Sequence, residues 1–162
     1  MITQIELQEQ FNYDADTGIF TWKVSHGKVK AGQVAGCCRP NGYVTINYNK
    51  TFYLAHRLAW LYVYGELPDN CLDHINCVRN DNRISNLRNA TTQQNNYNSK
   101  LSITNKSGVK GVYWMKNKNK WAVQICFNKI QKHIGLFNDL EFAKFVANEV
   151  RNKYHQEFAR SF

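Results

Sequence analysis

The sequence predicts an α+β protein built from small antiparallel sheets and a few helices, divided into two parts. Turn-forming residues recur at short intervals, which favours short strands joined in hairpins. Apolar residues follow helical spacing in stretch 55–64 and again after residue 138. A polar segment rich in Asn, Ser and Lys separates the parts, so we expect a first domain at 1–100, a linker at 101–106 and a second domain at 107–162.

The composition indicates a packed protein with an anionic partner. Hydrophobic residues make up 43% of the 162 residues, enough for a core. The net charge of +9 favours nucleic acid as the partner. Residues 103–162 hold 11 Lys/Arg against 4 Asp/Glu, whereas residues 1–102 hold 10 against 8. The C-terminal part therefore supplies most of the electrostatic attraction.

Cysteine usage and the N-terminus indicate a cytoplasmic protein. The odd number of cysteines, five, argues against a disulfide scaffold, and the absence of a C-x-x-C pair argues against a zinc knuckle. No apolar run approaches the roughly 18 residues of a membrane span, and the N-terminus lacks a signal-peptide pattern. We expect no membrane association, and no obligate protein partner is evident.

The first part begins with a predicted helix over 3–11, anchored by Ile5, Leu7 and Phe11. Turn chemistry at 14–18 leads into a strand at 19–24. A hairpin is expected from strands 43–48 and 51–54, followed by a helix over 55–64 that Gly65 ends. At the start of that helix His56 is expected to be a structural histidine hydrogen-bonded to the backbone, whereas Arg57 contacts either phosphate or the core.

The stretch from Cys71 to Asn98 carries the candidate chemistry. Residues 72–75 end one strand, an Asn- and Asp-rich loop follows, and 84–88 return toward the first strand. Thr91 is placed to cap a helix, with Gln94 completing a capping box. This strand–strand–helix unit folds the chain back across the 21 residues that separate His74 from Asn95.

The residue types in this unit suit metal-assisted cleavage of a phosphodiester bond. His74 suits the general base, because an unperturbed imidazole is mostly neutral at pH 7. Asp73 and Asn95 offer a carboxylate and an amide oxygen, ligands that suit Mg²⁺ (or Mn²⁺) better than zinc. One such ion per site would neutralise charge that develops on the phosphate.

The ordered set AHRLAW, DHIN, DNRISNLR and TTQQNN resembles the HNH, or ββα-metal (His-Me finger), endonucleases. It is similar to the phage and intron group whose last motif residue is Asn. The resemblance implies that the ββα-metal core spans about 71–100, that His74 activates water, and that Asp73 and Asn95 hold the metal. It also implies that Asn86 ties down the loop and orients His74. Arg88 either touches phosphate or forms a structural ion pair, and Asn96 is the rival of Asn95.

The sequence of the second part predicts three strands, at 109–115, 121–127 and 130–137. It also predicts a helix capped by Asn138, with Glu141 in a capping box. The apolar helix face is expected to comprise Phe142, Phe145, Val146, Val150 and Tyr154. Alternation in the middle strand directs Trp121, Val123, Ile125 and Phe127 to the helix and leaves Gln124 on the outer face.

The pieces KGV, KWAVQI and IGLF of this part resemble the APETALA-type, or ethylene-response-factor, DNA-binding domain. That resemblance implies a three-stranded sheet on one helix, with the sheet in the major groove of duplex DNA. Glutamine can bond an adenine edge, and lysines suit phosphate contacts. The expected DNA-binding residues, with Arg57 and Arg88 of the first part, are Lys110, Tyr113, Lys116, Lys118, Lys120, Gln124, Gln131 and His133.

Together these features predict a homing-type, phage-encoded DNA endonuclease that nicks duplex DNA as a monomer. A catalytically inactive DNA-binding regulator is the alternative. An RNA-binding protein is a weaker third interpretation, because a sheet suited to a wide major groove does not fit A-form RNA.

Overall fold

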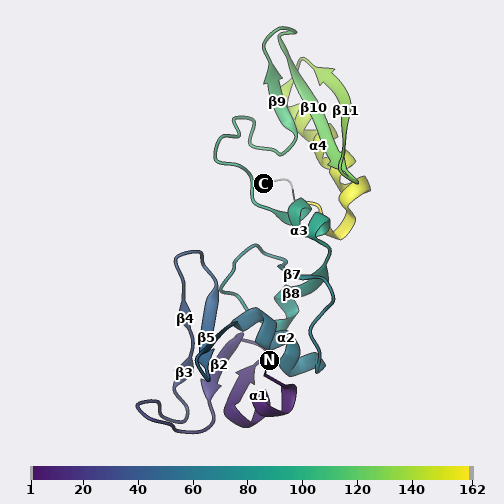
Figure 1. Ribbon diagram of the computed structural model, residues 1–162. Helices are drawn as coiled ribbons and strands as arrows, with labels where there is room; N and C mark the ends of the chain where they lie inside the picture. The colour runs from purple at the N-terminus through teal and green to yellow at the C-terminus, as the bar shows by residue number, and fades with distance from the viewer. Residues whose placement is uncertain (1, 161–162) are drawn as a thin grey trace. The chain divides into compact units, whose positions relative to one another are not determined.

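The computed structural model describes residues 2–160, which form two compact units. The first unit extends to Thr91 and the second begins at Thr92 (Figure 1). The helix that carries Asn95 and the expected linker at 101–106 both fall in the second unit. No helix within residues 2–160 is long and apolar enough to cross a membrane.

The first unit opens with α1 (Gln4–Gln10) and a three-stranded sheet in the order β1-β2-β3. Its strands are β1 (Phe11–Asp14), β2 (Ile19–Trp22) and β3 (Val34–Ala35). The side chain of Thr3 caps α1 by accepting a hydrogen bond from the Glu6 amide. The prediction that Ile5 anchors this helix is wrong, since its side chain is 71% exposed. Of the three predicted anchors, Leu7 and Phe11 are buried.

A second sheet and a helix complete the scaffold of the first unit. The sheet has the order β4-β5-β6, with β4 (Cys37–Cys38), β5 (Val44–Tyr48) and β6 (Thr51–Leu54). Helix α2 (Ala55–Tyr64) ends at Gly65 in the left-handed conformation. The predicted hairpin and helix are thereby confirmed, whereas β1, β3 and β4 were not predicted.

The core of this unit is an aromatic and aliphatic cluster between the sheets and α2. Phe11 is fully buried, with its ring centroid 4.4 Å from that of Trp22 and 6.2 Å from that of Phe20. Ile46 from β5 and Leu58 from α2 join the same cluster. Burial of such side chains contributes roughly 1.5–3 kcal/mol each, so this cluster fixes how the elements pack.

The chain then forms a two-stranded antiparallel sheet from β7 (Cys71–His74) and β8 (Leu87–Ala90). A 3₁₀ turn (Ile84–Asn86) precedes β8. The register places Asp73 opposite Arg88 and His74 opposite Leu87. The loop 75–83 therefore leaves and re-enters the sheet beside His74.

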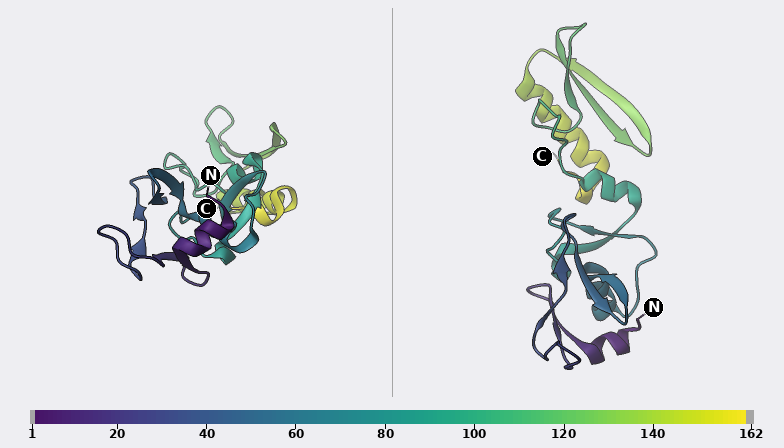
Figure 2. Two further views of the ribbon diagram at one scale, coloured as in Figure 1. Left: turned by 60° about the horizontal axis from the view of Figure 1, so that its bottom comes forward. Right: turned by 60° about the vertical axis from the view of Figure 1, so that its left-hand side comes forward.

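The second unit contains α3 (Thr92–Asn98) and a three-stranded antiparallel sheet that packs on α4 (Leu140–His155), which the 3₁₀ turn Gln156–Phe158 extends. The strands are β9 (Val112–Met115), β10 (Lys120–Phe127) and β11 (Ile130–Phe137), with β10 in the middle (Figure 2). Val123 packs in one cluster with Ala143 and Ala147, and Trp121 borders it. The predicted inward face of β10 agrees with this packing.

Two predictions for α4 are wrong. Asp139, not Asn138, caps the helix, because its side chain accepts a 2.7 Å hydrogen bond from the Phe142 amide. Phe142 and Phe145 are 55% and 60% exposed, so they do not form the packed face. Ala143 and Ala147 are buried instead, since small side chains let the helix axis approach the sheet closely.

Candidate functional site

His74 ends β7 and is almost completely buried, at 5% exposure. Its Nε2 lies 3.4 Å from Oδ1 of Asn82. Burial lowers the pKa of His74, while Asn82 and the carboxylates of Asp73 and Asp81 oppose this shift. The ring is therefore neutral at pH 7, and when Asn82 accepts the Nε2 hydrogen, Nδ1 carries the lone pair.

Asn82 is itself fixed by the N-terminal part of the unit. It is 2% exposed, and its backbone oxygen accepts a 2.7 Å hydrogen bond from the hydroxyl of Tyr13. Burial raises the pKa of Tyr13 to about 12, so this hydroxyl remains a donor. Gly18 packs against the next peptide, where a Cβ atom would lie 2.4 Å from the Arg83 nitrogen.

Asn86 holds the loop between the strands. Its Oδ1 accepts from the Asn76 amide at 3.0 Å, and its Nδ2 donates to the Asp81 backbone oxygen at 2.8 Å. The backbone oxygen of Asn86 also accepts from the Ile75 amide at 2.9 Å. These bonds tie Asn86 to the loop. The side chain that bonds Nε2 of His74 is that of Asn82, a residue that the sequence did not single out.

Asp81 is the charged centre of the loop. Its carboxylate accepts from Nε and Nη2 of Arg83, at 2.8 and 2.6 Å, and from Nδ2 of Asn76 at 2.6 Å. The bond to Arg83 is the main reason that the pKa of Asp81 falls to about 2. The loop is thus crosslinked by charge-assisted hydrogen bonds.

Asp73 lies next to His74 and is 4% exposed. Its Oδ2 accepts from both Nε and Nη2 of Arg88, each at 2.9 Å, directly across the two-stranded sheet. Of the two alternatives for Arg88, the structure contains the ion pair. A carboxylate has about four acceptor positions, so an arginine and a metal ion can share one carboxylate.

The remaining expected ligand, Asn95, is a half-buried residue of α3 in the second unit, and its neighbour Asn96 is exposed. Within residues 2–160, no group of three His, Cys, Asp or Glu side chains is arranged to hold a metal ion. A ligand pair of one carboxylate and one amide oxygen, as expected for Mg²⁺, does not require such a group.

A second imidazole and a tyrosine pack against the base. The His56 ring centroid lies 5.0 Å from that of His74, and the Tyr43 ring lies 5.3 Å from His56. Burial lowers the pKa of His56 to about 3, so it adds no charge beside His74. Arg79 covers Tyr43, with its guanidinium carbon 5.0 Å from the ring centroid. His56 thus contributes a neutral wall beside His74, but its buried Nδ1 has no hydrogen-bond partner within residues 2–160, which differs from the backbone-bonded histidine expected.

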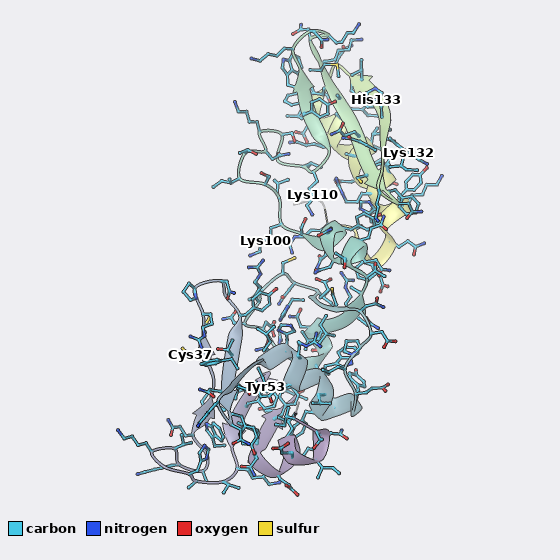
Figure 3. The ribbon with its side chains drawn as sticks, viewed as in Figure 1. Cys37, Tyr53, Lys100, Lys110, Lys132 and His133 are labelled. Atoms are coloured by element: carbon cyan, nitrogen blue, oxygen red, sulfur yellow. The ribbon has the colours of Figure 1, made fainter. Side chains whose placement is uncertain are left out.

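The expected DNA-binding residues differ in exposure. Arg57 is half-buried on α2, and in the second unit Lys120 and Gln124 are half-buried. Gln124 pairs with His133 across β10 and β11, which places their side chains next to each other. Exposed side chains of this set are those of Tyr113, Lys116, Lys118, Gln131 and His133. Figure 3 labels His133 on the sheet of the second unit.

Lys110 has a different role from the one expected. Its ammonium donates to the backbone oxygens of Tyr97, at 3.1 Å, and Ser99 at the end of α3. A lysine that caps the carbonyl end of a helix is favoured by the helix dipole. Its charge is therefore committed to packing within the second unit.

A buried, neutral imidazole next to a carboxylate is an arrangement suited to general-base chemistry beside a metal ion. A family model described as HNH endonuclease matches residues 53–97, from β6 into α3. Protein 3.8 of Escherichia phage T7 is 30% identical over 115 residues, which cover 68% of this chain and 94% of that protein.

The uncharacterized HNH endonuclease L560 of Acanthamoeba polyphaga mimivirus is 31% identical over 121 residues, 74% of this chain. The chain spans 62% of that protein's length. No solved structure matches the chain. Residues 53–97 therefore form an HNH endonuclease domain, and this domain together with the viral HNH relative makes the chain a nuclease hydrolase. Nucleases of this family act on DNA and generally depend on a divalent metal ion.

Gly18→Ala is expected to destabilise the protein and to impair catalysis. An alanine Cβ at position 18 would clash with the Asn82–Arg83 backbone, and residue 18 has a positive φ of 73°. The clash and the backbone strain together cost about 3 kcal/mol in unfolding free energy, and displacement of Asn82 lowers kcat roughly a hundredfold. Urea denaturation and single-turnover cleavage measure the two effects.

Gly27→Ala is the matched control, since Gly27 has a φ of 56° and a Cβ added there would meet nothing within 4 Å. It is expected to cost about 1 kcal/mol, from backbone strain alone, with cleavage unchanged. Equal losses of activity in the two variants would contradict the packing role of Gly18.

The Asp81 network is expected to make stability fall in acid. The folded pKa of about 2 lies below the ordinary 3.8, so the stabilisation is complete above pH 3.8 and disappears as the pH approaches 2. Urea midpoints measured at pH 5, 3 and 2 should fall more steeply in the wild type than in Asp81→Asn. Parallel curves for the two proteins would show that this carboxylate does not stabilise the fold.

Proposed function

We propose that this chain hydrolyses phosphodiester bonds of duplex DNA with one bound Mg²⁺ or Mn²⁺, as a homing-type, phage-encoded endonuclease. The observation that carries the proposal is the His74 ring, buried, neutral and hydrogen-bonded through Nε2 beside the Asp73 carboxylate. A neutral imidazole with a fixed orientation is the form that can accept a proton from water.

In the proposed reaction Nδ1 of His74 takes a proton from the attacking water. Asn82 accepts the Nε2 hydrogen and stabilises the imidazolium that results, while Asn86 holds the loop that carries Asn82. This division makes Asn82 the orienting residue and Asn86 the support behind it.

The proposed metal ligands are Asp73 and Asn95. When bound, the ion would supply positive charge to the scissile phosphate and the 3′ leaving oxygen. Arg88 holds the Asp73 carboxylate in one orientation through two hydrogen bonds to Oδ2. Asn95 is favoured over Asn96 because it is half-buried, and a ligand loses less entropy when its side chain is already restricted.

One such site per chain leads us to propose that a monomer nicks one strand. Site recognition is assigned to the second unit, where a three-stranded antiparallel sheet packs on one helix, as in APETALA-type domains. The net charge of +7 in residues 103–162 supports this assignment. Gln124, Gln131 and His133 lie on β10 and β11, where they would face base edges.

His74→Ala tests the reaction. Wild-type protein with Mg²⁺ should convert a supercoiled plasmid that carries its target into open circles, and His74→Ala should lower the rate by at least roughly a thousandfold. His56→Phe, which keeps a ring beside His74, is the matched control and should retain activity. Unchanged cleavage by His74→Ala would refute the assignment of the base.

The alternative, a catalytically inactive DNA-binding regulator, predicts a different pattern in the same assay. Such a protein would retard duplex DNA equally with Mg²⁺ and with EDTA, and would leave the plasmid supercoiled in both. Cleavage that EDTA abolishes excludes it.

The sheet assignment predicts a separation of affinity from specificity. Lys116→Ala or Lys118→Ala should weaken binding to all sequences and lower the salt slope by about 1, because each removes a phosphate contact. Gln124→Ala should relax the preference at one base pair, measured by selection from a random-sequence library. A change of preference in the lysine variants, with none in Gln124→Ala, would mean that the sheet is oriented differently.

A further inference from the structure

The first unit has a strongly basic segment that the proposed mechanism does not use. Residues 23–50 contain five Lys/Arg and no Asp/Glu, whereas the rest of residues 1–91 contains four Lys/Arg and eight Asp/Glu. All five basic side chains are exposed: Lys23, Lys28, Lys30, Arg39 and Lys50. The excess of positive over negative charge in this unit is thus confined to residues 23–50.

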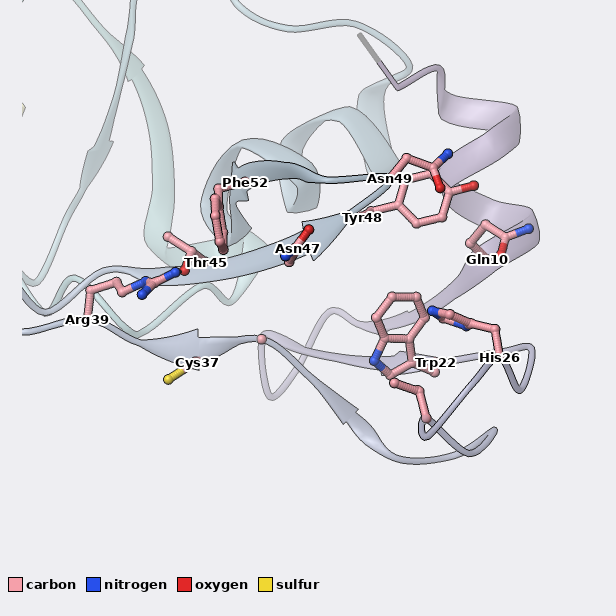
Figure 4. Close-up of a pocket in the computed structure, with 12 residues that line it drawn as sticks. Gln10, Trp22, His26, Cys37, Arg39, Thr45, Asn47, Tyr48, Asn49 and Phe52 are labelled. Atoms are coloured by element: carbon pink, nitrogen blue, oxygen red, sulfur yellow. The ribbon is translucent and has the colours of Figure 1, made fainter.

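The same segment forms most of a groove of about 690 Å³ (Figure 4). One side is the outer face of the β4-β5-β6 sheet, with Thr45, Asn47 and Phe52, and the other side includes Trp22 and His26. Asn47 and Phe52 are directly opposite in the β5–β6 register, so their side chains project from one face. The described residues that line the groove include no carboxylate, although Glu6 bonds the Tyr48 hydroxyl at one end.

Arg39 is held in place within this groove. Its guanidinium carbon lies 4.9 Å from the ring centroid of Phe52, and its Nε donates to Oγ1 of Thr45 at 2.8 Å. Phe52 remains 62% exposed under this contact. An exposed arginine restrained in this way loses little entropy when it binds phosphate or a guanine edge.

The groove lies over the antiparallel β5–β6 hairpin of the three-stranded sheet. β5 and β6 are joined by a tight turn in which Asn49 and Lys50 have φ of 48° and 62°. A two-stranded antiparallel ribbon fits the major groove of B-DNA, and amide side chains such as that of Asn47 can bond base edges there.

We propose that the β5–β6 hairpin, with Arg39 and Phe52, is a second duplex-DNA-binding surface, carried by the nuclease unit itself. It binds phosphates and groove edges of the duplex independently of the sheet in the second unit. This inference rests on the proposed function, since it assumes that the substrate is DNA.

The test measures binding of the full chain to a fluorescein-labelled 30-base-pair duplex of mixed sequence, in EDTA, by anisotropy at several salt concentrations. Arg39→Ala should weaken binding roughly tenfold and lower the salt slope by about 1. Phe52→Ala should weaken binding roughly threefold to tenfold and leave the slope unchanged. Both side chains are exposed, so thermal melting should match the wild type.

Tyr64→Ala removes an exposed aromatic of the same unit that does not line the groove, and it should bind as the wild type does. Wild-type affinity and slope in both groove variants would overturn the proposal while leaving the nuclease assignment intact. A loss confined to single-stranded DNA of the same sequence would overturn the duplex assignment. Failure of the wild type itself to bind or cleave DNA would instead refute the proposed function.

Discussion

The candidate site depends on where Asn82 is held. This residue joins three parts of the first unit, because its backbone oxygen bonds Tyr13, its peptide packs on Gly18, and its side chain bonds His74. Tyr13 and Gly18 belong to β1 and to the turn that follows it, about 70 residues earlier in the chain. The N-terminal sheet therefore supports the residue whose side chain bonds the imidazole.

Around this support, the site keeps its charges balanced before any substrate arrives. Asp73 is paired with Arg88, Asp81 with Arg83, and the two buried histidines are neutral. Unpaired charges at this depth would cost several kcal/mol in desolvation, so pairing is what allows a carboxylate to lie at 4% exposure. The Asp73 carboxylate therefore has to accept hydrogen bonds from Arg88 and also coordinate any metal ion.

The hairpin 43–54, helix 55–64 and the strands around residues 74 and 88 could be predicted because turn residues and apolar spacing act locally. Asn82 could not be singled out, since its role comes from Tyr13 and Gly18, and nothing near Asn82 in the sequence marks that contact. Ile5 was wrongly predicted to be buried because the short helix α1 carries Ile5 and Leu7 on different faces. Only the tertiary packing determines that Leu7 is the buried one. Likewise, small Ala143 and Ala147 carry little weight in an apolar pattern, yet they define the packed face of α4.

The ion pair of Asp73 bears on how the proposed metal would bind. Two hydrogen bonds from Arg88 reduce the negative charge that Asp73 presents, and an amide such as Asn95 adds none. These protein ligands alone would attract a divalent ion weakly, because they offer little negative charge. A phosphate of a DNA substrate would supply the missing negative charge. Binding of metal and of DNA is therefore expected to be mutually reinforcing, as reciprocal linkage requires, and the ion would be held firmly only where there is a bond to cut.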